Sequence, residues 1–434
     1  MTLDGEKRLT ELFTLTPLQT KSIAAGFCTA LERGLAGLPS SLKMLPAYLT
    51  LPDGSEQGTF LTVDFGGTNL RVLMVELALN GNMTILQRRD VPFYDEVYGR
   101  NLLFAEASAE ELFDFIAEQL AALDLPSTVY SLGHTFSFPC IQTDINNAVL
   151  LRWTKEIQTL GVEGQEVNVL LRAALNRRGL SKIIPRAVIN DTVGTLLTAA
   201  YGNPRTRIGT ICGTGHNTCY LEPRFTPDGK PMIINMEAGN FDQFPCTAYD
   251  KLVDIGSVQP GQQRLEKAVS GRYIGEVFRV VMTQLLQEGV IFPAYSREIF
   301  AQPYAITAEE LSVMLSDGAD DLNYVRVWLE AHGVYNAKHG HMKLLRTLAD
   351  IIVRRSARLV ASTCWGVLAH LDPGCEEHHE IAVDGSLYEK MPGYKDEMAK
   401  TIEELAGGKV QQISVRLVKD GSGFGAALAA AMAK

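Results

Sequence analysis

The sequence predicts an α/β protein of two lobes in which a unit of strand, glycine-containing turn and strand occurs twice. The first unit is FLTVDFGGTNLRVLMVEL at residues 60–77, where two apolar runs flank Asp64 and a pair of glycines. The second is RIGTICGTGHNTCYLE at 207–222, where apolar runs flank a Gly-Thr-Gly turn. Predicted strands and helices alternate after each unit, which is typical of α/β folds.

Length and composition indicate an ordinary globular chain of two or three domains. The 434 residues are 46% apolar and 21% charged, and 50 acidic residues face 40 Lys and Arg. The resulting net charge of −10 argues against a nucleic-acid-binding protein. Any phosphate site must therefore be built locally, from backbone N–H groups, helix ends, a metal or a few cations.

The first half of the chain yields a regular series of expected elements. We expect a helix over 8–36, a proline-containing loop, the two strands of 60–77, a turn at 80–82, a strand at 83–89, a helix at 108–123, a strand at 129–138 and a helix at 164–179. Ser108 and Glu111 have the spacing of a capping box at the start of one of these helices. A short buried strand at 187–190 then leads into a helix that begins at Asp191.

The second half repeats this alternation after the second unit. Helical patterns cover 262–287 and 341–371, and the stretches 380–390 and 412–434 each give a strand, a turn and a helix. No repeat of 20–50 residues is visible, which excludes a solenoid. We place the small lobe in 59–190 plus 422–434, and the large lobe in 1–58 plus 191–421.

The turn Asp64-Phe65-Gly66-Gly67-Thr68-Asn69 has the composition of a phosphate site. Glycines let backbone N–H groups approach an anion, and Thr68, Asn69 and Arg71 add donors and a positive charge. Asp64 could reach a metal-bound water, since Mg²⁺ takes few carboxylates and keeps several waters. The alternative is a glycine-rich hairpin turn with a locally capping aspartate. Neither a protein-kinase His-Arg-Asp run nor a Walker-type motif accompanies the turn.

The stretch VINDTVGTLL places Asn190 and Asp191 between a buried strand and a helix. Asp191 could simply cap the helix. It could also be a general base at a strand end, where ligands of α/β sheets gather, because phosphoryl transfer to an alcohol needs a carboxylate for the hydroxyl proton.

Several polar residues near predicted strand ends could together orient a polyol, although a single residue of this kind is more often a solvated surface residue. They are Ser137, Thr154, Lys155, Asn217, Glu237 and Glu266. The scattered histidines give no zinc pattern. The glycine-rich run at 421–425 precedes a single terminal helix, which favours a phosphate or nucleotide contact at a helix start over a dinucleotide fold.

Taken together, these stretches resemble the eukaryotic-type hexokinase family, glucokinase included, over nearly the whole chain as one catalytic unit. The motifs that carry the resemblance are, in order, LTVDFGGTNLRV, GHTFSFPC, LLRWTKEI with GVEGQEV, VINDTVGTLLTAAY, ICGTGHNTCYLE, INMEAGNFD, QPGQQRLEKAVSGRYIGEVFR, VDGSLYE and DGSGFGAAL. The resemblance implies the two-lobed actin-like, ribonuclease H-like ATPase fold with a sugar cleft between the lobes. It also implies ATP- and Mg²⁺-dependent phosphorylation of the 6-hydroxyl of a hexose, glucose foremost.

The resemblance also assigns roles by position. Asp191 falls on the catalytic base, with Lys155 beside it as a second catalytic residue. The sugar contacts fall on Ser137, Phe138, Thr154, Lys155, Asn190, Asp191, Asn217, Glu237 and Glu266. The nucleotide and phosphate contacts fall on Asp64, Gly66, Gly67, Thr68, Asn69, Arg71, Gly213, Thr214, Gly215, Gly385, Ser386, Gly421, Ser422 and Gly423. Asp64 is expected to hold Mg²⁺ through water.

Two positions depart from the family pattern. The usual Glu-Trp-Gly is Glu237-Ala238-Gly239 here, and the usual Asn-Pro-Gly is Gln259-Pro260-Gly261. Neither change removes an expected ligand. With no signal peptide, no membrane-spanning run, no hydrophobic mitochondrial anchor and seven cysteines without C-x-x-C spacing, we expect a cytoplasmic monomer or homodimer.

Two other readings of the same residues stay open. A non-sugar ATPase of the same superfold would need the two phosphate turns but not the polyol set. A sugar-sensing regulator would keep the body of a hexokinase with a weak or inactive catalytic site. The presence of Asp191, Thr68 and Thr214 favours the enzyme over the sensor.

Overall fold

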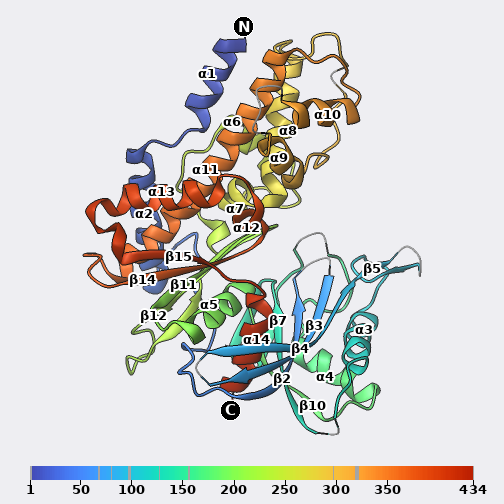
Figure 1. The fold of residues 1–434 in the computed structure, drawn as a ribbon. Helices are drawn as coiled ribbons and strands as arrows, with labels where there is room; N and C mark the ends of the chain where they lie inside the picture. Colours follow the sequence, from blue (N-terminus) through green and yellow to red (C-terminus); the bar gives the residue numbers. More distant parts are fainter. Residues whose placement is uncertain are drawn as a thin grey trace.

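The computed structural model divides the chain into an upper part made mainly of helices and a lower part built on a sheet (Figure 1). The N-terminus lies at the top of this view and the C-terminus at the bottom. The structure describes residues 2–66, 69–79, 81–95, 99–126, 128–154, 157–296, 298–317 and 322–433.

The large sheet, as we name it, has the strand order β1-β13-β12-β11-β14-β15 in the described part of the chain. Its strands are β1 (Leu45–Pro46), β11 (Thr206–Cys212), β12 (His216–Glu222), β13 (Met232–Asn235), β14 (His379–Asp384) and β15 (Ile413–Leu417). β11 pairs antiparallel with β12 and parallel with β14, and β14 pairs parallel with β15. The expected second unit is thus a hairpin in the middle of this sheet.

The small sheet has the order β10-β7-β2-β3-β4 in the described residues. Its strands are β2 (Gly58–Phe65), β3 (Asn69–Ala78), β4 (Asn82–Pro92), β7 (Tyr130–Phe136) and β10 (Ile183–Ile189). β2 pairs antiparallel with β3 and parallel with β7, and β7 pairs parallel with β10. Short pairs flank this sheet: β5 (Tyr94–Asp95) with β6 (Arg100–Asn101), and β8 (Cys140–Asp144) with β9 (Asn147–Leu150).

The two sheets share one topology. Reading from β15 and from β10, each order runs through two parallel strands to a hairpin strand, its antiparallel partner and a further antiparallel strand. The equivalent hairpins are β2–β3 and β11–β12, the two units seen in the sequence. The topology therefore confirms the predicted duplication. The exact lobe boundaries are a separate matter and stay a prediction.

Two helices lie between the sheets and tie them together. α5 (Asp191–Gly202) follows β10 of the small sheet and packs on β11 of the large sheet, while α14 (Gly421–Met432) follows β15 of the large sheet and packs on β2 and β7 of the small one. The helices cross closely, because a Cβ on Gly425 would lie 2.2 Å from the Cα of Gly194. Figure 1 shows α5 and α14 side by side at the centre of the molecule.

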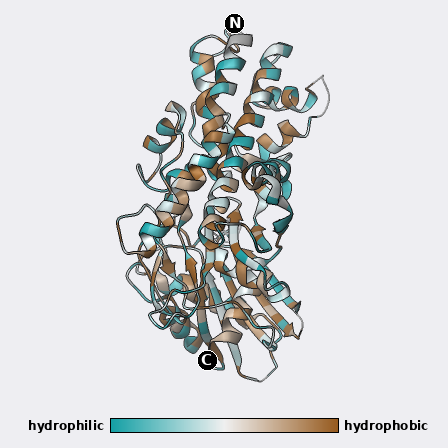
Figure 2. Ribbon diagram, turned by 90° about the vertical axis from the view of Figure 1, so that its left-hand side faces the viewer, coloured by the Kyte–Doolittle hydropathy of each residue, from teal (hydrophilic) through white to brown (hydrophobic). Residues whose placement is uncertain are grey.

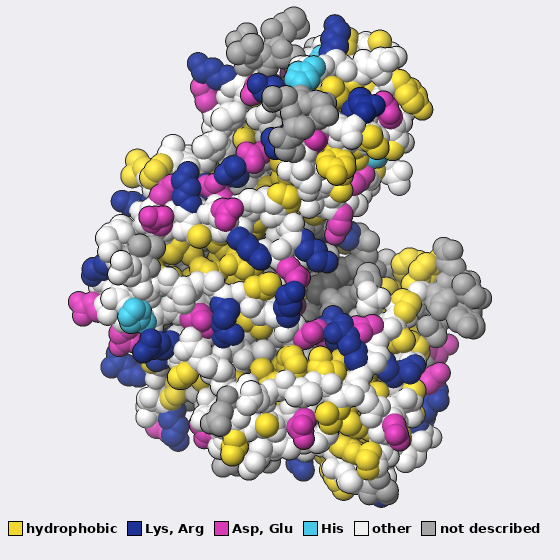
Figure 3. Space-filling view, in the orientation of Figure 1, with side chains coloured by type: hydrophobic (Ala, Val, Ile, Leu, Met, Phe, Trp, Pro, Cys, Tyr) yellow, Lys and Arg dark blue, Asp and Glu magenta, His cyan; other side chains and the backbone are white. Residues whose placement is uncertain are grey.

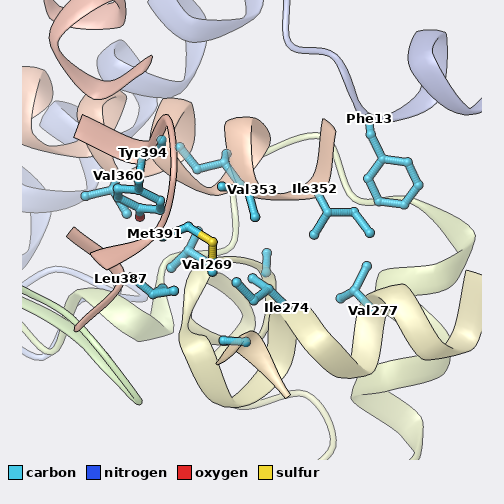
Figure 4. Packing of buried hydrophobic residues seen from close by; sticks show 14 of the residues in the cluster. Phe13, Val269, Ile274, Val277, Ile352, Val353, Val360, Leu387, Met391 and Tyr394 are labelled. Atoms are coloured by element: carbon cyan, nitrogen blue, oxygen red, sulfur yellow. The ribbon is translucent and has the colours of Figure 1, made fainter. Parts of the chain in front are cut away.

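The remaining helices cover the sheets. They are α1 (Thr2–Phe13), α2 (Pro17–Leu35), α3 (Ala109–Ala121), α4 (Val167–Arg177), α6 (Ala248–Ile255), α7 (Arg264–Val269), α8 (Gly271–Gln287), α9 (Ala308–Leu315), α10 (Asn323–Ala331), α11 (His339–Leu371), α12 (Ser386–Lys390) and α13 (Tyr394–Ala406). Apolar residues line their inward faces and the strands (Figure 2). Figure 4 shows part of the upper core, where Ile352 and Val353 of α11 lie above Ile274 and Val277 of α8.

Most expected elements are present, but two long patterns that predicted single helices each form two helices. The pattern at 8–36 is divided between α1 and α2, because Thr16 forms a capping box with Gln19 and Pro17 begins a new helix. The pattern at 262–287 is divided between α7 and α8 at Ser270, which has an extended backbone. The capping box of Ser108 and Glu111 is confirmed.

In the described part of the chain, no helix has both the length and the hydropathy that crossing a bilayer requires. The expected turn at 80–82 includes Asn80, which lies outside the described residues.

Candidate active site

Three carboxylates of the described residues meet where strands of the two sheets end. Asp64 lies near the end of β2, Asp191 begins α5, and Asp384 ends β14. Burial raises the pKa of Asp384 to about 6, and the charges of Asp191 and Asp64 raise it further. Hydrogen bonds from the N–H groups of Gly385 and Gly421 act in the other direction and offset part of this rise. Asp191 and Asp64 are therefore both close enough to Asp384 to repel its carboxylate, and a cation or a proton bound there would relieve that repulsion.

At the first turn, Asp64 and Arg71 belong to one polar network. The Ser422 hydroxyl donates to Oδ2 of Asp64 over 2.6 Å. Nη1 of Arg71 lies 3.7 Å from the same oxygen and donates to Oδ1 of Asp420 over 3.0 Å, while its Nε donates to Asp90 over 3.1 Å. The turn thus presents a carboxylate and a guanidinium together, and the start of α14 closes over them.

A second arginine completes this network into a ring. Arg88 of β4 donates to Asp90 through Nε and Nη2, and to Asp420 through Nη1 over 3.1 Å. The hydrogen bond from Arg88 holds the pKa of the Asp90 carboxyl below its usual range, with Arg71 contributing. Asp420 has a left-handed backbone, φ 54°, and does not cap α14 with its side chain. Its role is to bind both arginines where the chain passes from one sheet to the other.

At the start of α5, Asn190 and Asp191 have different roles in capping the helix. Asn190, and not Asp191, is the N-cap: its Oδ1 accepts from the N–H of Thr192 over 3.0 Å and from the Thr192 hydroxyl over 2.6 Å. Asp191 also accepts from the Thr192 N–H, over 2.8 Å. Since capping falls to Asn190, the simple cap alternative for Asp191 is wrong.

The second turn is built from backbone and carries no charge of its own. The N–H of Gly271 donates to the carbonyl of Gly213 over 2.8 Å, and the N–H of Arg272 donates to that of Thr214 over 3.1 Å. The start of α8 therefore abuts the turn. Gly385, with φ 119°, lies against it as well, because a Cβ there would be 2.4 Å from the Cys212 carbonyl oxygen. Thr214 is left exposed at the tip.

The residues expected to bind sugar meet beside this turn. Nδ2 of Asn217 donates to Oδ1 of Asn235 over 2.8 Å, to Oδ1 of Asn190 over 3.3 Å, and to Oε1 of Glu237 over 3.5 Å. Oε2 of Glu266 accepts from the N–H of His216 over 2.9 Å, which places this carboxylate against the same hairpin. Amides and carboxylates thus converge from β12, β13, α5 and α7.

Three expected sugar contacts come from the small-sheet side. Ser137 and Phe138 follow β7 and are buried, and the N–H of Ser137 donates to the carbonyl of Phe65. Phe138 packs edge-on against Phe65 and Trp153, with ring centroids 5.2 and 4.9 Å apart. Thr154 directly follows this tryptophan and is half-buried. Packing of Phe65, Phe138 and Trp153 therefore holds the segments that contain Ser137 and Thr154 together.

The remaining expected contacts divide into three groups. Gly67, Thr68 and Lys155 lie outside the described residues. Gly66, Asn69 and Ser386 are exposed near the first turn and at the start of α12. A Cβ on Gly423 would lie 2.5 Å from Cδ1 of Leu73, so α14 packs closely on β3 at this glycine. Nucleotide contacts by these residues stay predictions.

The two departures from the family pattern make their described hydrogen bonds through the backbone. Ala238 is fully buried in the main core, and its N–H donates to Oδ1 of Asn217. Gln259 uses its backbone carbonyl to accept from Lys267 over 2.6 Å. At both positions the hydrogen bond is made by the backbone and does not depend on the side chain, and no expected ligand is displaced.

The donor set is compatible with Mg²⁺. Among the described residues no three acidic, histidine or cysteine side chains form a ready cage. Mg²⁺ does not require one, because it is commonly held by one or two carboxylates together with waters and substrate phosphates. Asp64, Asp191 and Asp384 supply hard oxygen ligands, and such a cation would relieve the repulsion that Asp384 experiences from the other two.

Sequence reasoning missed Asp384, Asn235 and the partners of Arg71. Asp384 had a usable signal, because it ends an apolar strand before a glycine, in the same pattern as Asp64. Asn235 could have been suspected from its place two residues before Glu237 at a strand end. The ring of Arg88, Asp90 and Asp420 had no sequence signal, since Asp420 lies far along the chain from the other two.

A hollow opens between the upper part and the lower right part of the molecule (Figure 3). A cavity of about 80 Å³ lies at the junction of the two sheets. Asn190 and Asn235 line it together with Phe136 and Phe138, so its walls come from both parts. The polar network of the site therefore borders space between the two sheets.

The paired sheets, the exchanged helices α5 and α14, and the carboxylates at facing strand ends define the two-lobed actin-like ATPase fold. Family models described as hexokinase match residues 6–201 and 207–432. A solved hexokinase from Schistosoma mansoni complexed with glucose superposes with a TM-score of 0.89 at 32% identity, covering 99% of both chains.

Relatives in sequence agree with the structural match. Hexokinase-1 of Schizosaccharomyces pombe is 34% identical over 449 residues, which cover 99% of this chain and 90% of that protein. Hexokinase-3 of Mus musculus is 36% identical, with 97% of this chain and 46% of that protein covered, so this chain spans about half of the mammalian relative. The chain belongs to the hexokinase family and is a hexose kinase, which confirms the resemblance inferred from its motifs.

Proposed function

We propose that this hexose kinase transfers the γ-phosphoryl group of ATP to the 6-hydroxyl of D-glucose and of related hexoses, with Asp191 as the general base. The observation that carries the proposal is the position of Asp191. It begins a helix already capped by Asn190, which is hydrogen-bonded to Asn217, and its charge acts on Asp384 as does that of Asp64 in the first turn. The glucose in the Schistosoma mansoni structure supports the choice of sugar.

Sugar binding is assigned to side chains that can accept or donate to hydroxyls. Glu237 and Glu266 accept, while the amides of Asn190 and Asn217 complete the set from the large-sheet side. Hydrogen bonds to charged groups contribute about 1.5–3 kcal/mol each, so these carboxylates dominate affinity. Ser137 and Thr154 contribute from the small-sheet side, and Lys155 is expected to assist there.

Binding from both sides favours closure of the two lobes, with 59–190 plus 422–434 moving as the small lobe. Contacts that the sugar makes to both lobes can be complete only in the closed form, which shifts the equilibrium toward it. Closure removes water that would otherwise compete with the sugar hydroxyl for the phosphoryl group. The chain passes between the sheets at 189–191 and 417–421, where the hinge is expected.

Within the closed site each part has a separate task. Asp191 accepts the hydroxyl proton as the oxygen attacks, and the two glycine turns with Arg71 orient the phosphates in line. Asp64 would hold Mg²⁺ through water, and the ion when bound would offset phosphate charge. Asn190 holds the segment that carries the base.

A coupled assay tests the proposal directly. ATP consumption is measured without sugar and with glucose, fructose, mannose or N-acetylglucosamine, and the product is identified by ³¹P and ¹³C NMR. We expect glucose-dependent turnover with the phosphate on carbon 6, and no transfer to 6-deoxyglucose. Sugar binding without turnover would indicate a sensor and would overturn the proposal, as would phosphate on another carbon.

A further inference from the structure

We propose that Asn235 is a positioning residue that fixes the Glu237 carboxylate and the Asn217 amide in the orientation that binds sugar. The inference rests on the proposed function, since it takes Asn217 and Glu237 as sugar ligands. Asn235 is the last residue of β13 and is 8% exposed, so it lies behind the ligands.

The direction of the hydrogen bonds in this chain of side chains is set by backbone donors. Oδ1 of Asn217 accepts from the N–H of Thr218 over 2.7 Å and from the N–H of Ala238 over 3.0 Å. Because an amide oxygen must face those N–H groups, Nδ2 of Asn217 is the atom that donates to Oδ1 of Asn235.

The same direction continues to Glu237. Since Oδ1 of Asn235 accepts from Asn217 and from the Glu237 N–H over 3.3 Å, its Nδ2 is the donor to Oε1 of Glu237 over 2.9 Å. Glu237 is thereby held as an acceptor with one oxygen committed to Asn235. The geometry selects sugar hydroxyls that donate at this place.

The backbone at Glu237 shows how much the site depends on this support. Glu237 is in the left-handed region, φ 52° and ψ 51°, which is uncommon for a residue other than glycine. Asn235 accepts from its N–H, and the Asn240 amide donates to its carbonyl over 3.2 Å. Gly239 follows closely, where a Cβ would lie 2.5 Å from Oε1 of Gln263. Asn235 therefore orients both the backbone and the side chain of a sugar ligand.

The chain of amides also reaches the start of α5. Nδ2 of Asn217 lies 3.3 Å from Oδ1 of Asn190, which caps the helix that carries Asp191. A shift of Asn217 after loss of Asn235 would thus be felt by two sugar-binding positions. We expect the effect to fall on the sugar and to leave the nucleotide side nearly unchanged.

The test compares Asn235→Ala and Asn235→Asp with a matched buried amide. Asn168 of α4 is 2% exposed and donates to Asn146 over 2.7 Å, in the part of the molecule built on the small sheet. Calorimetry measures glucose affinity, and steady-state kinetics measures KM for glucose and for ATP. We expect Asn235→Ala to raise the glucose Kd about tenfold to hundredfold with the ATP KM within about twofold. Asn168→Ala should lower stability and leave the glucose Kd unchanged.

Asn235→Asp gives a readout that a purely structural role would not move. The new carboxylate has no N–H and faces Glu237, so the two repel when both are ionised. We expect a weakened glucose Kd at pH 8 that recovers at pH 5.5, relative to wild type at each pH. A wild-type Kd at pH 8 in either Asn235 variant would overturn this inference alone. A wild-type protein that binds no hexose would overturn the proposed function instead.

Discussion

The two hairpin turns have the same topology, but one carries charged side chains and the other does not. The β2–β3 turn carries its own charges, with Asp64 and Arg71 tied to Asp420. The β11–β12 turn carries none, and the start of α8 and Gly385 support it through backbone contacts. The carboxylates around it come from other elements: Glu266 of α7 accepts from the N–H of His216, and Asp384 ends the neighbouring strand β14 beside Gly385. The duplicated framework thus presents charged side chains at one turn and closely packed backbone at the other.

The exchanged helices extend this contrast. Asp191 begins α5, and Asp420 immediately precedes α14. The Asp420 side chain is bound by two arginines, whereas the hydrogen bond described for the Asp191 side chain is the one from the N–H of Thr192. The Asp191 carboxylate thus has no arginine among its described partners, while the arginines on Asp420 tie the start of α14 to β3 and β4.

The largest expected effect tests this asymmetry. Asp191→Ala should lower kcat by about 10²–10⁴, the usual span for loss of a general base. Asp420→Asn, the matched change on the α14 side, should lower kcat by less than about tenfold, because partly exposed ion pairs contribute little. Single-turnover kinetics with both variants measures this. Equal losses would show that the two helix starts are not specialised.

The packing of α5 on α14 gives the next effect. Gly425→Ala places a methyl group 2.2 Å from the Cα of Gly194, in backbone that cannot yield cheaply. We expect a loss of about 3 kcal/mol in the free energy of unfolding, at the upper end of overpacking changes. Gly340→Ala, at a helical glycine with nothing within 4 Å, is the control and should be neutral or stabilising. Urea unfolding measures both variants, and equal free energies of unfolding would contradict the close contact of α5 with α14.

The raised pKa of Asp384 at the end of β14 predicts that stability depends on pH. The folded pKa of about 6 exceeds the ordinary 3.8, so the native state binds the proton more tightly and stability falls as pH rises from about 4 to 6. A shift of this size corresponds to about 1–3 kcal/mol, lost above pH 6. Relative to wild type, Asp384→Asn should therefore gain stability between pH 4 and pH 7. Denaturant unfolding across that range checks the sign, and a difference independent of pH would refute it.

The smallest effect concerns the arginine ring of the first turn. Without Arg88, Asp90 and Asp420 would hold Arg71 more firmly, so Arg88→Ala should raise the ATP KM about twofold to fivefold. Asp90→Asn should shift the ATP KM the other way, because it releases Arg71. Initial rates at low and high salt measure both, and the difference should shrink with salt. Shifts in the same direction would exclude this competition.

Local pattern was sufficient for much of the fold. Alternating apolar runs around Asp64 and around Gly213-Thr214-Gly215 predicted both hairpins, and the Ser108–Glu111 spacing predicted a helix start that the structure confirms. The breaks at Thr16 and Ser270 were missed, because helical periodicity continues across each of them while one residue turns to an extended backbone.

The sequence by itself determined the duplicated unit, the placement of Asp64 and Asp191 at strand and helix ends, and the hexokinase family. These depend on residue order and on spacings of a few residues, which the chain carries locally. Tertiary structure alone decided that Asp384 joins those carboxylates, that Asp420 binds Arg71 and Arg88, and that Asn235 supports Glu237 and Asn217. Such partners lie up to hundreds of residues apart, and only the folded sheets and exchanged helices bring them within hydrogen-bond distance.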